Sequence, residues 1–550
     1  MKIQYKIIYS LLGLAILFAD VSCKKGFEEL NAPYKDATVS TATPAGFFNN
    51  LARRATDDAY TLHTTLIMPK LNQQGVQNIV SLPYVNYITT YWQAYYQDLA
   101  DYKQLLKLID ATSTPAAYTD VKSMATILIA SKTLSMLDRY GSIPYSSAGI
   151  ATDGIEKYRP TYDDEKSIYM SILADLATAV NSIGGAGQIN IGNYESFLAN
   201  DFDAWRKFGN ALRLRYAVRL SAKAEMQALV TGIIQDVVTG NKPLPNNQNL
   251  TALQKSNFGN YPLIVVPQTD YNLRYWYSFR EASVGNMRMS TNVWNQMSST
   301  NADDGSGIFD PRCKIWFMPN NAGKWVPQPQ NSAGSAPGST GTAYPNQETP
   351  SAPNLPNGNV YAPFNFYMVR DFASFPYLII TEADVHFLKA EIYNRGLGGV
   401  AANPTMAKSE YDAGLKASVD FWYGYVNNGT TSFWPSTGVG GKPGALSTTD
   451  WNNFINTPAV MYNVADPATT NYQKIVKQAW LATIWQPLEA WAIVRRTGIT
   501  PKDPAYSSPD VVNKLPYPND EENNNNDNWK AAAGGADQTQ QAAKKVYWMP

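Results

Sequence analysis

Two long blocks of helical periodicity constrain the fold of this 550-residue chain more than any other feature. Apolar side chains recur at spacings of three and four in residues 46–240 and again in residues 376–500. The clearest stripe consists of Ile168, Ile172, Leu176, Ala179 and Ile183. That spacing places side chains on one face of an α-helix, whereas a half-buried strand requires strict alternation, which is nowhere sustained. The sequence therefore predicts a mainly α fold.

The second block also predicts how its helices are arranged. Thr381 is placed to cap a helix that ends at Gly396, and another helix is expected from Thr405 to Tyr425. Two antiparallel helices joined by a short turn form a tetratricopeptide-like hairpin. We expect hairpins of this kind to build both blocks.

Residues 241–375 differ in composition from both blocks. Proline, glycine, asparagine, serine and threonine dominate there, and a helical period survives only around Ala282–Met297. The segment is too long for a simple connection. We therefore predict a single domain over 46–550, in which 241–375 is a loop-rich insert folded against the helical repeats of 46–240 and 376–500.

The stretch from Leu137 to Ala148 marks a helix end. A helical pattern leads into it, and Gly141 is suited to the left-handed conformation that closes a helix. Pro144 then prevents the helix from resuming. We expect a helix that stops at this turn.

A later helix is expected through Trp205, Phe208, Leu212, Tyr216 and Leu220. Its interleaved basic residues are Arg206, Lys207, Arg213, Arg215 and Arg219. Such a run forms either an anion-binding face or, far more commonly, the solvated or internally paired side of an amphipathic helix. We expect the second arrangement.

The N-terminus has the features of a lipoprotein signal. Two lysines precede the apolar run Ile7–Ala19, which is too short to span a bilayer comfortably, and small residues precede Cys23. We predict a signal peptide over 1–22, lipidation of Cys23, and a lipidated tether over 23–45. The other cysteine, Cys313, is expected to pack as a buried thiol and not to form a disulfide.

Charge and motif content argue against several classes of protein. Lysine plus arginine equals aspartate plus glutamate at 45 each, so no net field favours nucleic acid. The two histidines, His63 and His386, are far apart and no cysteine ligand pair occurs, so neither a metal nor a cofactor is expected. Gly396–Ala401 fits G-x-G-x-x-A, but it follows a helix where the dinucleotide fingerprint requires a strand. No catalytic residue is predicted, although two carboxylates brought together by folding would suit glycoside hydrolysis.

Several short phrases occur in an order that resembles one protein family. They are Phe27–Asn31, Asp138–Ser146 (D-R-Y-G-S-I-P-Y-S), Trp205–Arg215, Asp310–Arg312, Thr381–Glu391, Glu489–Trp491, Arg495–Gly498, Tyr517–Glu521 and the terminal aromatics Tyr547 and Trp548. These phrases are spread over nearly the whole mature chain. They resemble the SusD/RagB family of nutrient-binding outer-membrane lipoproteins, and most closely a divergent SusD-like branch.

This resemblance implies a function and partners. Members of the family are lipid-anchored in the outer membrane, face the cell exterior, and bind an oligosaccharide or a peptide. They deliver this ligand to a SusC-like TonB-dependent transporter on which they sit as a lid. The chain is accordingly expected to be a binding protein and not an enzyme. The alternative is a lipid-anchored glycoside hydrolase, which requires two carboxylates facing each other in one cleft.

Ligand-binding residues are expected among loop aromatics and nearby amides. Sugar C–H faces stack on aromatic rings, and sugar hydroxyls bind amides and charged donors. Two neighbourhoods qualify, residues 69–90 and the insert, and family resemblance favours the same two. The candidate residues are Asn72, Gln73, Asn78, Tyr84, Tyr87, Trp276, Arg288, Trp316, Asn320 and Trp325. Local loop packing is the alternative role for each of the aromatics.

Overall fold

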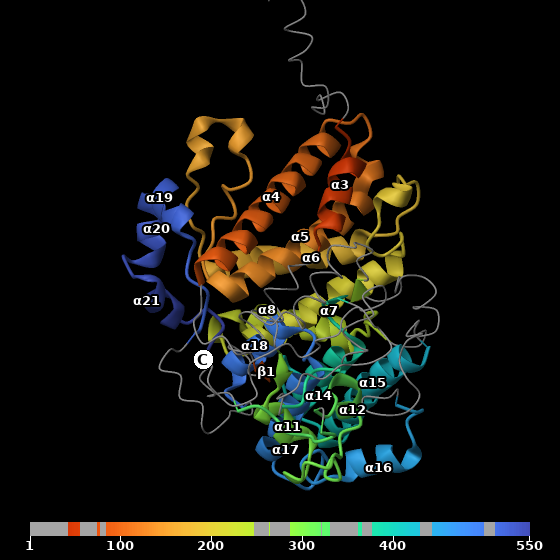
Figure 1. Cartoon of the computed structure of the whole chain (residues 1–550). Coiled ribbons are helices and arrows are strands. Elements are labelled where there is room, and N and C mark those ends of the chain that lie inside the picture. The colour runs from red at the N-terminus through yellow and green to blue at the C-terminus, as the bar shows by residue number, and fades with distance from the viewer. Residues whose placement is uncertain are drawn as a thin grey trace, which may run out of the picture.

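Helices dominate the described part of the chain, which confirms the mainly α prediction (Figure 1). The computed structural model describes residues 42–55, 74–76, 84–246, 263–264, 287–320, 322–329, 361–365, 377–428, 443–499 and 512–550. Its strands are two-residue segments: β1 (Gly75–Val76) pairs with β3 (Arg288–Met289), and β2 (Leu263–Ile264) pairs with β4 (Tyr377–Leu378). The predicted signal peptide and Cys23 lie outside the described residues.

The first helical block is built from neighbouring helices that pack in sequence order. Its long helices are α3 (Pro44–Arg53), α4 (Tyr84–Asp110), α5 (Thr119–Tyr140), α6 (Glu165–Ser182), α7 (Phe202–Leu220) and α8 (Gln227–Ile234). Shorter turns are η3 (Pro115–Tyr118), η4 (Ala151–Asp153), η5 (Ile155–Tyr158), η6 (Gly192–Tyr194), η7 (Ala224–Met226) and the π-helical η8 (Gln235–Thr239). The stripe predicted from Ile168 to Ile183 is buried along α6.

Local interactions set the start of α6 and the end of α5. The Asp164 side chain caps α6 by accepting from the backbone N–H groups of Lys166 and Ser167 at 3.2 and 3.0 Å. Gly141 follows α5 with φ +74°, a value that favours glycine. Its ψ of −134° lies outside the left-handed helical region that the sequence suggested, because the chain leaves α5 in an extended direction.

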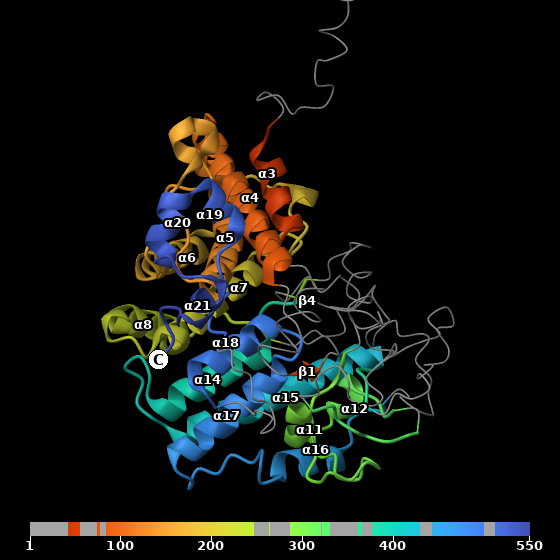
Figure 2. The ribbon, with the colours of Figure 1, turned by 60° about the vertical axis from the view of Figure 1, so that its left-hand side comes forward.

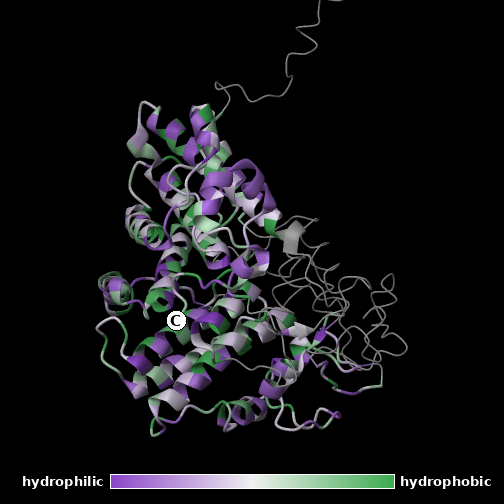
Figure 3. Ribbon diagram, turned by 90° about the vertical axis from the view of Figure 1, so that its left-hand side faces the viewer, coloured by the Kyte–Doolittle hydropathy of each residue, from purple (hydrophilic) through white to green (hydrophobic). Residues whose placement is uncertain are grey.

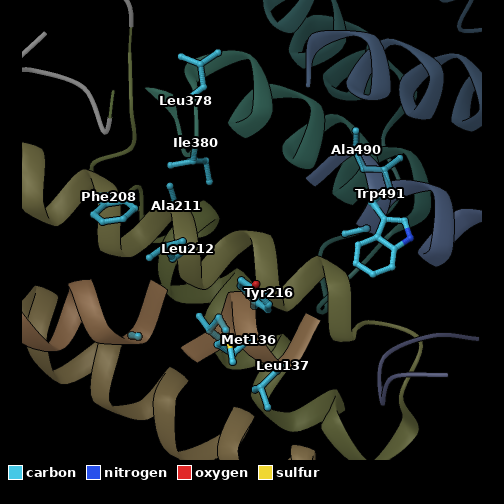
Figure 4. Close-up of a cluster of buried hydrophobic side chains, with 14 of the residues drawn as sticks. Met136, Leu137, Phe208, Ala211, Leu212, Tyr216, Leu378, Ile380, Ala490 and Trp491 are labelled. Carbon is cyan, nitrogen blue, oxygen red and sulfur yellow. The ribbon is translucent and has the colours of Figure 1, made fainter. Parts of the chain in front are cut away.

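Helix α7 lies between the two helical blocks. Figure 4 shows Phe208 and Leu212 of α7 between Met136 and Leu137 of α5 and the Leu378–Ile380 segment. A methyl group added at Gly209 would lie 2.2 Å from Val180 Cγ1, so α6 and α7 approach closely at this residue. Because both sides of α7 are covered, its apolar stripe and most of its arginines are buried.

The second block consists of α14 (Glu382–Arg395), α15 (Pro404–Asn428), α16 (Thr448–Asn456), α17 (Ala468–Ala482) and α18 (Pro487–Thr497). A capping box between Thr381 and Asp384 starts α14, and Gly396 ends it at φ +70°. Helices α14 and α15 pack on each other, which confirms the predicted hairpin. Gly396–Ala401 is the turn of this hairpin, and the helix before it leaves no place for the strand of a dinucleotide site.

The C-terminal helices α19 (Asn519–Asn524), α20 (Asn526–Ala533) and α21 (Gln538–Ala543) return to the first block. Figures 1 and 2 show α19 and α20 beside α4. Glu521 accepts hydrogen bonds from Trp92 Nε1 at 3.2 Å and Tyr162 Oη at 2.8 Å. The two ends of the described chain therefore stabilise one helical block.

The described part of the insert contains β2, β3, α11 (Thr291–Met297) and α12 (Cys313–Trp316). The helical pattern expected from Ala282 to Met297 was wrong over residues 287–290. Two of these residues form β3, and the Ser290 side chain caps α11 by accepting from Val293 N at 3.2 Å. Strand pairing and a cap thus override the apolar spacing.

Hydrophobic and hydrophilic residues are interspersed along the helices, as Figure 3 shows. This pattern fits helices that bury one face against their neighbours. Within the described ranges, no helix is both long enough and apolar enough to cross a membrane.

Candidate functional site

The two neighbourhoods predicted to carry the ligand site are adjacent in the structure. Strand β1, from residues 69–90, pairs antiparallel with β3 of the insert, with Gly75 opposite Met289. Gln74, which precedes β1, is buried and donates from Nε2 to Trp480 O at 2.6 Å. This corner of the insert is therefore attached to α17.

Further bridges extend this pairing into a small layer. Met289 N donates to Ala362 O at 2.9 Å, and Gln328 N donates to Met289 O at 2.8 Å. Asn365 N donates to Trp316 O at 2.7 Å. Four segments of the insert thus hold one another in place, and we refer to this layer with β1 as the insert corner.

A buried ion pair fixes the insert on the second helical block. Arg312 binds Asp310 through Nη2 at 2.6 Å and Nε at 3.0 Å, and both side chains are fully buried. Arg312 also donates to Ser418 of α15 at 2.9 Å and to Gln478 of α17 at 2.7 Å. The Asp310–Arg312 phrase therefore connects the insert to the helices below it.

Two of the predicted ligand residues lie inside this assembly. Trp316 is 0% exposed and packs edge-on against Trp422, with ring centroids 6.0 Å apart. Arg288 is 1% exposed and donates from Nη1 to Met287 O at 3.2 Å. Neither side chain reaches solvent in this structure, which favours the packing role for both.

Asn320 and Trp325 occupy a turn near the surface of the insert. Asn320 Oδ1 accepts from Ala322 N at 2.9 Å and Lys324 N at 3.0 Å, so this amide shapes the turn. Trp325 stacks on Trp294, with ring centroids 6.3 Å apart and 14° between the planes. Its 9% exposure is the largest among the candidates whose side chains are described.

The side chains of the remaining candidates are not described by the structure. Tyr84 and Tyr87 lie in the first turn of α4, where only the backbone is described. Asn72, Gln73, Asn78 and Trp276 lie outside the described residues. Their nearest described neighbours in the first segment, Gln74 and Val76, belong to the insert corner.

A concave site that the sequence did not predict lies between α7, α14, α17 and α18. The cavity has a volume of about 30 Å³, enough for only one or two water molecules. Its lining consists of Arg215, Arg219, Asp384, Phe387, Leu388, Glu391, Ile475, Val476, Ala479, Thr483, Glu489, Ile493 and Arg496. Three arginines and three carboxylates give the lining no net charge.

Arginines hold the carboxylates of this cavity. Arg215 binds Asp384 at 3.2 Å and Glu489 at 3.4 Å, while Arg219 also binds Glu489. Arg496 binds both Glu391 oxygens, at 2.6 and 2.7 Å. These contacts confirm the internal pairing expected for the arginines of α7.

Burial and the ion pairs act in opposite directions on the carboxyls of the cavity. At Asp384 burial outweighs Arg215 and raises the pKa. Burial alone would raise the pKa of the Glu489 carboxyl, but Arg215 and Arg219 outweigh it and lower the pKa to about 2. Burial opposes Arg496 in the same way at Glu391, whose pKa is also lowered. A general acid needs a pKa near the working pH, so these two glutamates are unsuited to donate a proton.

The structure describes one of the two cysteines and one of the two histidines that could serve as metal ligands. Within the described ranges, no group of three or more histidine, cysteine, aspartate or glutamate side chains is placed to hold a metal. Cys313 is buried, as expected, and burial raises the pKa of its thiol. His386 Nδ1 lies 2.6 Å from Glu410 Oε2, and Nε2 lies 3.5 Å from Glu382 Oε1. His63 lies outside the described residues.

Comparison with known proteins assigns the family. The family model of SusD-like proteins, described as starch-binding and associating with the outer membrane, matches residues 35–518. The chain belongs to this SusD-like family. No curated protein sequence matches it.

Solved structures similar to this SusD-like protein share its fold at low identity. A chitin-binding protein is 19% identical with a TM-score of 0.65, and 92% of this chain and 100% of that one are covered. A chitin-binding SusD homologue from Flavobacterium johnsoniae is 19% identical with a TM-score of 0.61, covering 92% and 97%. A SusD homologue from Parabacteroides distasonis is also 19% identical, with a TM-score of 0.63 and coverage of 92% and 98%.

The phrases that carried the resemblance build the scaffold of this SusD-like protein. Asp138 accepts from Tyr216 Oη at 2.6 Å, from Trp548 Nε1 at 2.8 Å and from Arg219. Arg495 donates to the backbone carbonyl of Asp138 at 2.6 Å. The cavity could have been anticipated from the same phrases, because they contain Asp384, Glu391, Glu489 and Arg496.

Proposed function

We propose that this chain is a surface-exposed nutrient-binding protein that captures a glycan. The match of residues 35–518 to a family described as starch-binding and associating with the outer membrane carries this proposal. Two of the similar structures are named chitin-binding proteins, which supports a glycan over a peptide. An array of starch-type and chitin-type oligosaccharides, with peptides as competitors, tests the ligand class. Saturable binding of peptides alone would contradict the proposal.

We further propose that Cys23 anchors the protein in the outer membrane and that the protein faces the cell exterior. A lipoprotein-type signal over 1–22 and the tether over 23–45 support this placement. Metabolic labelling with a clickable fatty acid should label the wild-type protein and not Cys23→Ala. Equal labelling of both proteins would exclude this lipid anchor.

The ligand is proposed to pass to a SusC-like TonB-dependent transporter on which the protein sits as a lid. Purification from detergent-solubilised outer membranes should recover a large β-barrel protein in stoichiometric amount. The control is the same purification from cells that lack the partner transporter. Recovery of the chain alone under mild detergent conditions would argue against this partner.

We infer that the chain binds its ligand without hydrolysing it. The glycoside hydrolase alternative requires an acid and a second carboxylate in one cleft. The cavity offers three carboxyls, but the pKa values of Glu391 and Glu489 are lowered by their arginines. Burial raises the pKa of Asp384, but its Oδ2 accepts hydrogen bonds from Arg215 at 3.2 Å and Gln486 at 2.9 Å. Turnover of a bound oligosaccharide by the pure protein, lost in Glu489→Gln, would support the hydrolase instead.

The glycan is proposed to bind at the insert corner and its neighbouring loops. Trp325 is the described aromatic candidate nearest to solvent, and Trp276 belongs to the same insert. Trp325→Ala and Trp276→Ala should each weaken binding by roughly 1 to 3 kcal/mol, as at other stacking platforms. Tyr194→Ala, at an exposed position on η6, is the control. Calorimetry that shows unchanged affinity in both tryptophan variants would place the site elsewhere.

A further inference from the structure

The two most exposed large hydrophobic side chains of the described chain lie together at one tip. Ile155 is 86% exposed and Tyr158 is 66% exposed, and both belong to the 3-10 helix η5. Residues three apart in a 3-10 helix lie on the same face. The tip loop, residues 150–159, therefore presents an aliphatic and an aromatic side chain on one side.

The base of the tip loop is held firmly on the first helical block. Lys103 Nζ donates to the carbonyls of Ser146 at 2.9 Å and Ala148 at 2.6 Å. On the other side, Asn525 Nδ2 donates to Pro160 O at 2.9 Å. An ion pair between Lys107 and Asp153 fixes the tip itself. The exposed pair is thus displayed by a supported loop.

The tip loop lies at the end of the molecule from which the N-terminal segment departs. Figures 1 and 2 both show the first turn of α3, the last turns of α4 and the loop between α5 and α6 at this end. Eighteen residues separate Cys23 from Ala42, the first described residue. A chain of that length spans at most about 65 Å, so an anchor at Cys23 would hold this end of the molecule within about 65 Å of the membrane.

We propose that the tip loop contacts the lipid surface beside the anchor, with Ile155 and Tyr158 entering the interfacial region. This inference relies on the proposed lipid anchor. Tyrosine suits an interface because its ring is apolar and its hydroxyl is polar, and an aliphatic neighbour adds apolar area. The tip carries Asp153, Glu156, Lys157 and Arg159, so its charges balance and anionic lipid is not required. Contact at the tip would set the tilt of the protein on the membrane.

A fluorescence experiment tests the contact without relying on lipidation. The chain from residue 24 onward, with an N-terminal hexahistidine tag, is attached to phosphatidylcholine vesicles that contain a nickel-chelating lipid. An environment-sensitive fluorophore is placed at Ile155→Cys or, as the control, at Val464→Cys. Val464 is 48% exposed, and the loop between α16 and α17 that carries it lies at the opposite end of the molecule (Figures 1 and 2). The buried Cys313 is spared by labelling the folded protein.

The label at position 155 should shift to shorter emission wavelength on vesicles and be quenched by nitroxide-bearing lipid, whereas the label at 464 should show neither effect. Untagged chain should bind vesicles weakly, and Ile155→Ser with Tyr158→Ser should weaken that binding by about tenfold. An unshifted label at 155 on vesicles would overturn the proposal. So would a shift that appears without vesicles and grows with protein concentration, because it would indicate a second copy. Failure of Cys23 labelling in cells would remove the natural anchor, but the tag would still test the tip.

Discussion

Removal of the Asp138 carboxylate tests whether the Asp138–Ser146 turn holds the fold together. This side chain is 12% exposed and accepts from Arg219, Tyr216 Oη and Trp548 Nε1. These donors come from α7 and from the C-terminal segment, so one carboxylate connects three distant parts of the chain. Asp138→Ala leaves all three donors without this acceptor.

The magnitude follows from the partners that remain. Arg219 keeps Glu489, so the loss there is one charged hydrogen bond, about 1.5 to 3 kcal/mol. Two neutral donors in a buried site add about 1 kcal/mol each. We therefore expect Asp138→Ala to lower the free energy of unfolding by about 3 to 5 kcal/mol, in the range for breaking a buried ion pair.

Urea unfolding followed by circular dichroism at 222 nm measures this loss. Asp412→Ala is the matched control, because Asp412 pairs with Lys408 on an exposed face of α15 and its side chain is 42% exposed. That variant should lose no more than about 0.5 kcal/mol. Trp548→Phe removes only one donor, and its effect should shrink in the Asp138→Ala background. Equal losses in Asp138→Ala and Asp412→Ala would refute the reasoning.

Three further predictions concern pH, the insert and helix packing. Burial raises the pKa of Glu165 from 4.5 to about 7, so its contribution to stability is fully present below pH 4.5 and lost as the pH rises to about 7. Wild type should lose roughly 2 kcal/mol relative to Glu165→Gln over this range in unfolding experiments, and parallel pH profiles would contradict this. Asp310→Asn removes the ionic partner of buried Arg312 and should cost about 3 to 5 kcal/mol, with faster proteolysis of the insert, while Asp303→Asn at an exposed pair should behave like wild type. Gly209→Ala should lower the melting temperature through a clash with Val180 worth about 1 to 3 kcal/mol, whereas Gly232→Ala meets no atom within 4 Å and should not; equal melting temperatures would count against the close contact of α6 and α7.

Most long helices and some of their ends could be predicted because their causes are local, whereas the start of α11 and the conformation of Gly141 could not. Asp164 and Thr381 cap the residues that follow them, and Gly396 ends a helix by its own φ. Spacing of three and four along α6 gave the buried face directly. None of these features requires knowledge of distant parts of the chain.

The buried arginines of α7 could be predicted only as an internally paired or solvated face. An amphipathic helix normally turns its arginines toward solvent. Here α7 is covered on both sides, so Arg215 and Arg219 need carboxylates that lie far away in sequence, at Asp384 and Glu489. The partner residues stand in the short phrases, but their distances from α7 are set by folding.

Residue types predicted the two ligand neighbourhoods, but they did not predict that β1 and β3 pair or which side chains are buried. Strands β1 and β3 have two residues each, too few for an alternating pattern. Loop position also did not reveal that Trp316 is fully buried, because its burial depends on Trp422 in a helix more than a hundred residues later. An aromatic loop residue can serve as a ligand platform or as core, and tertiary contacts decide between these roles.

The contacts that join the helical blocks are separate from the insert, where we propose that the ligand binds. Asp138, Arg219 and Glu489 connect the two helical blocks and the C-terminus, and none of them belongs to the insert. The insert is attached through the β1–β3 pair and through Asp310 and Arg312. Because the contacts among Asp138, Arg219 and Glu489 do not pass through the insert, substitutions on the insert can change its surface without breaking the link between the helical blocks. Most of the short phrases lie in the helical blocks, so they identify the fold and carry little information about a ligand whose proposed site lies in the insert.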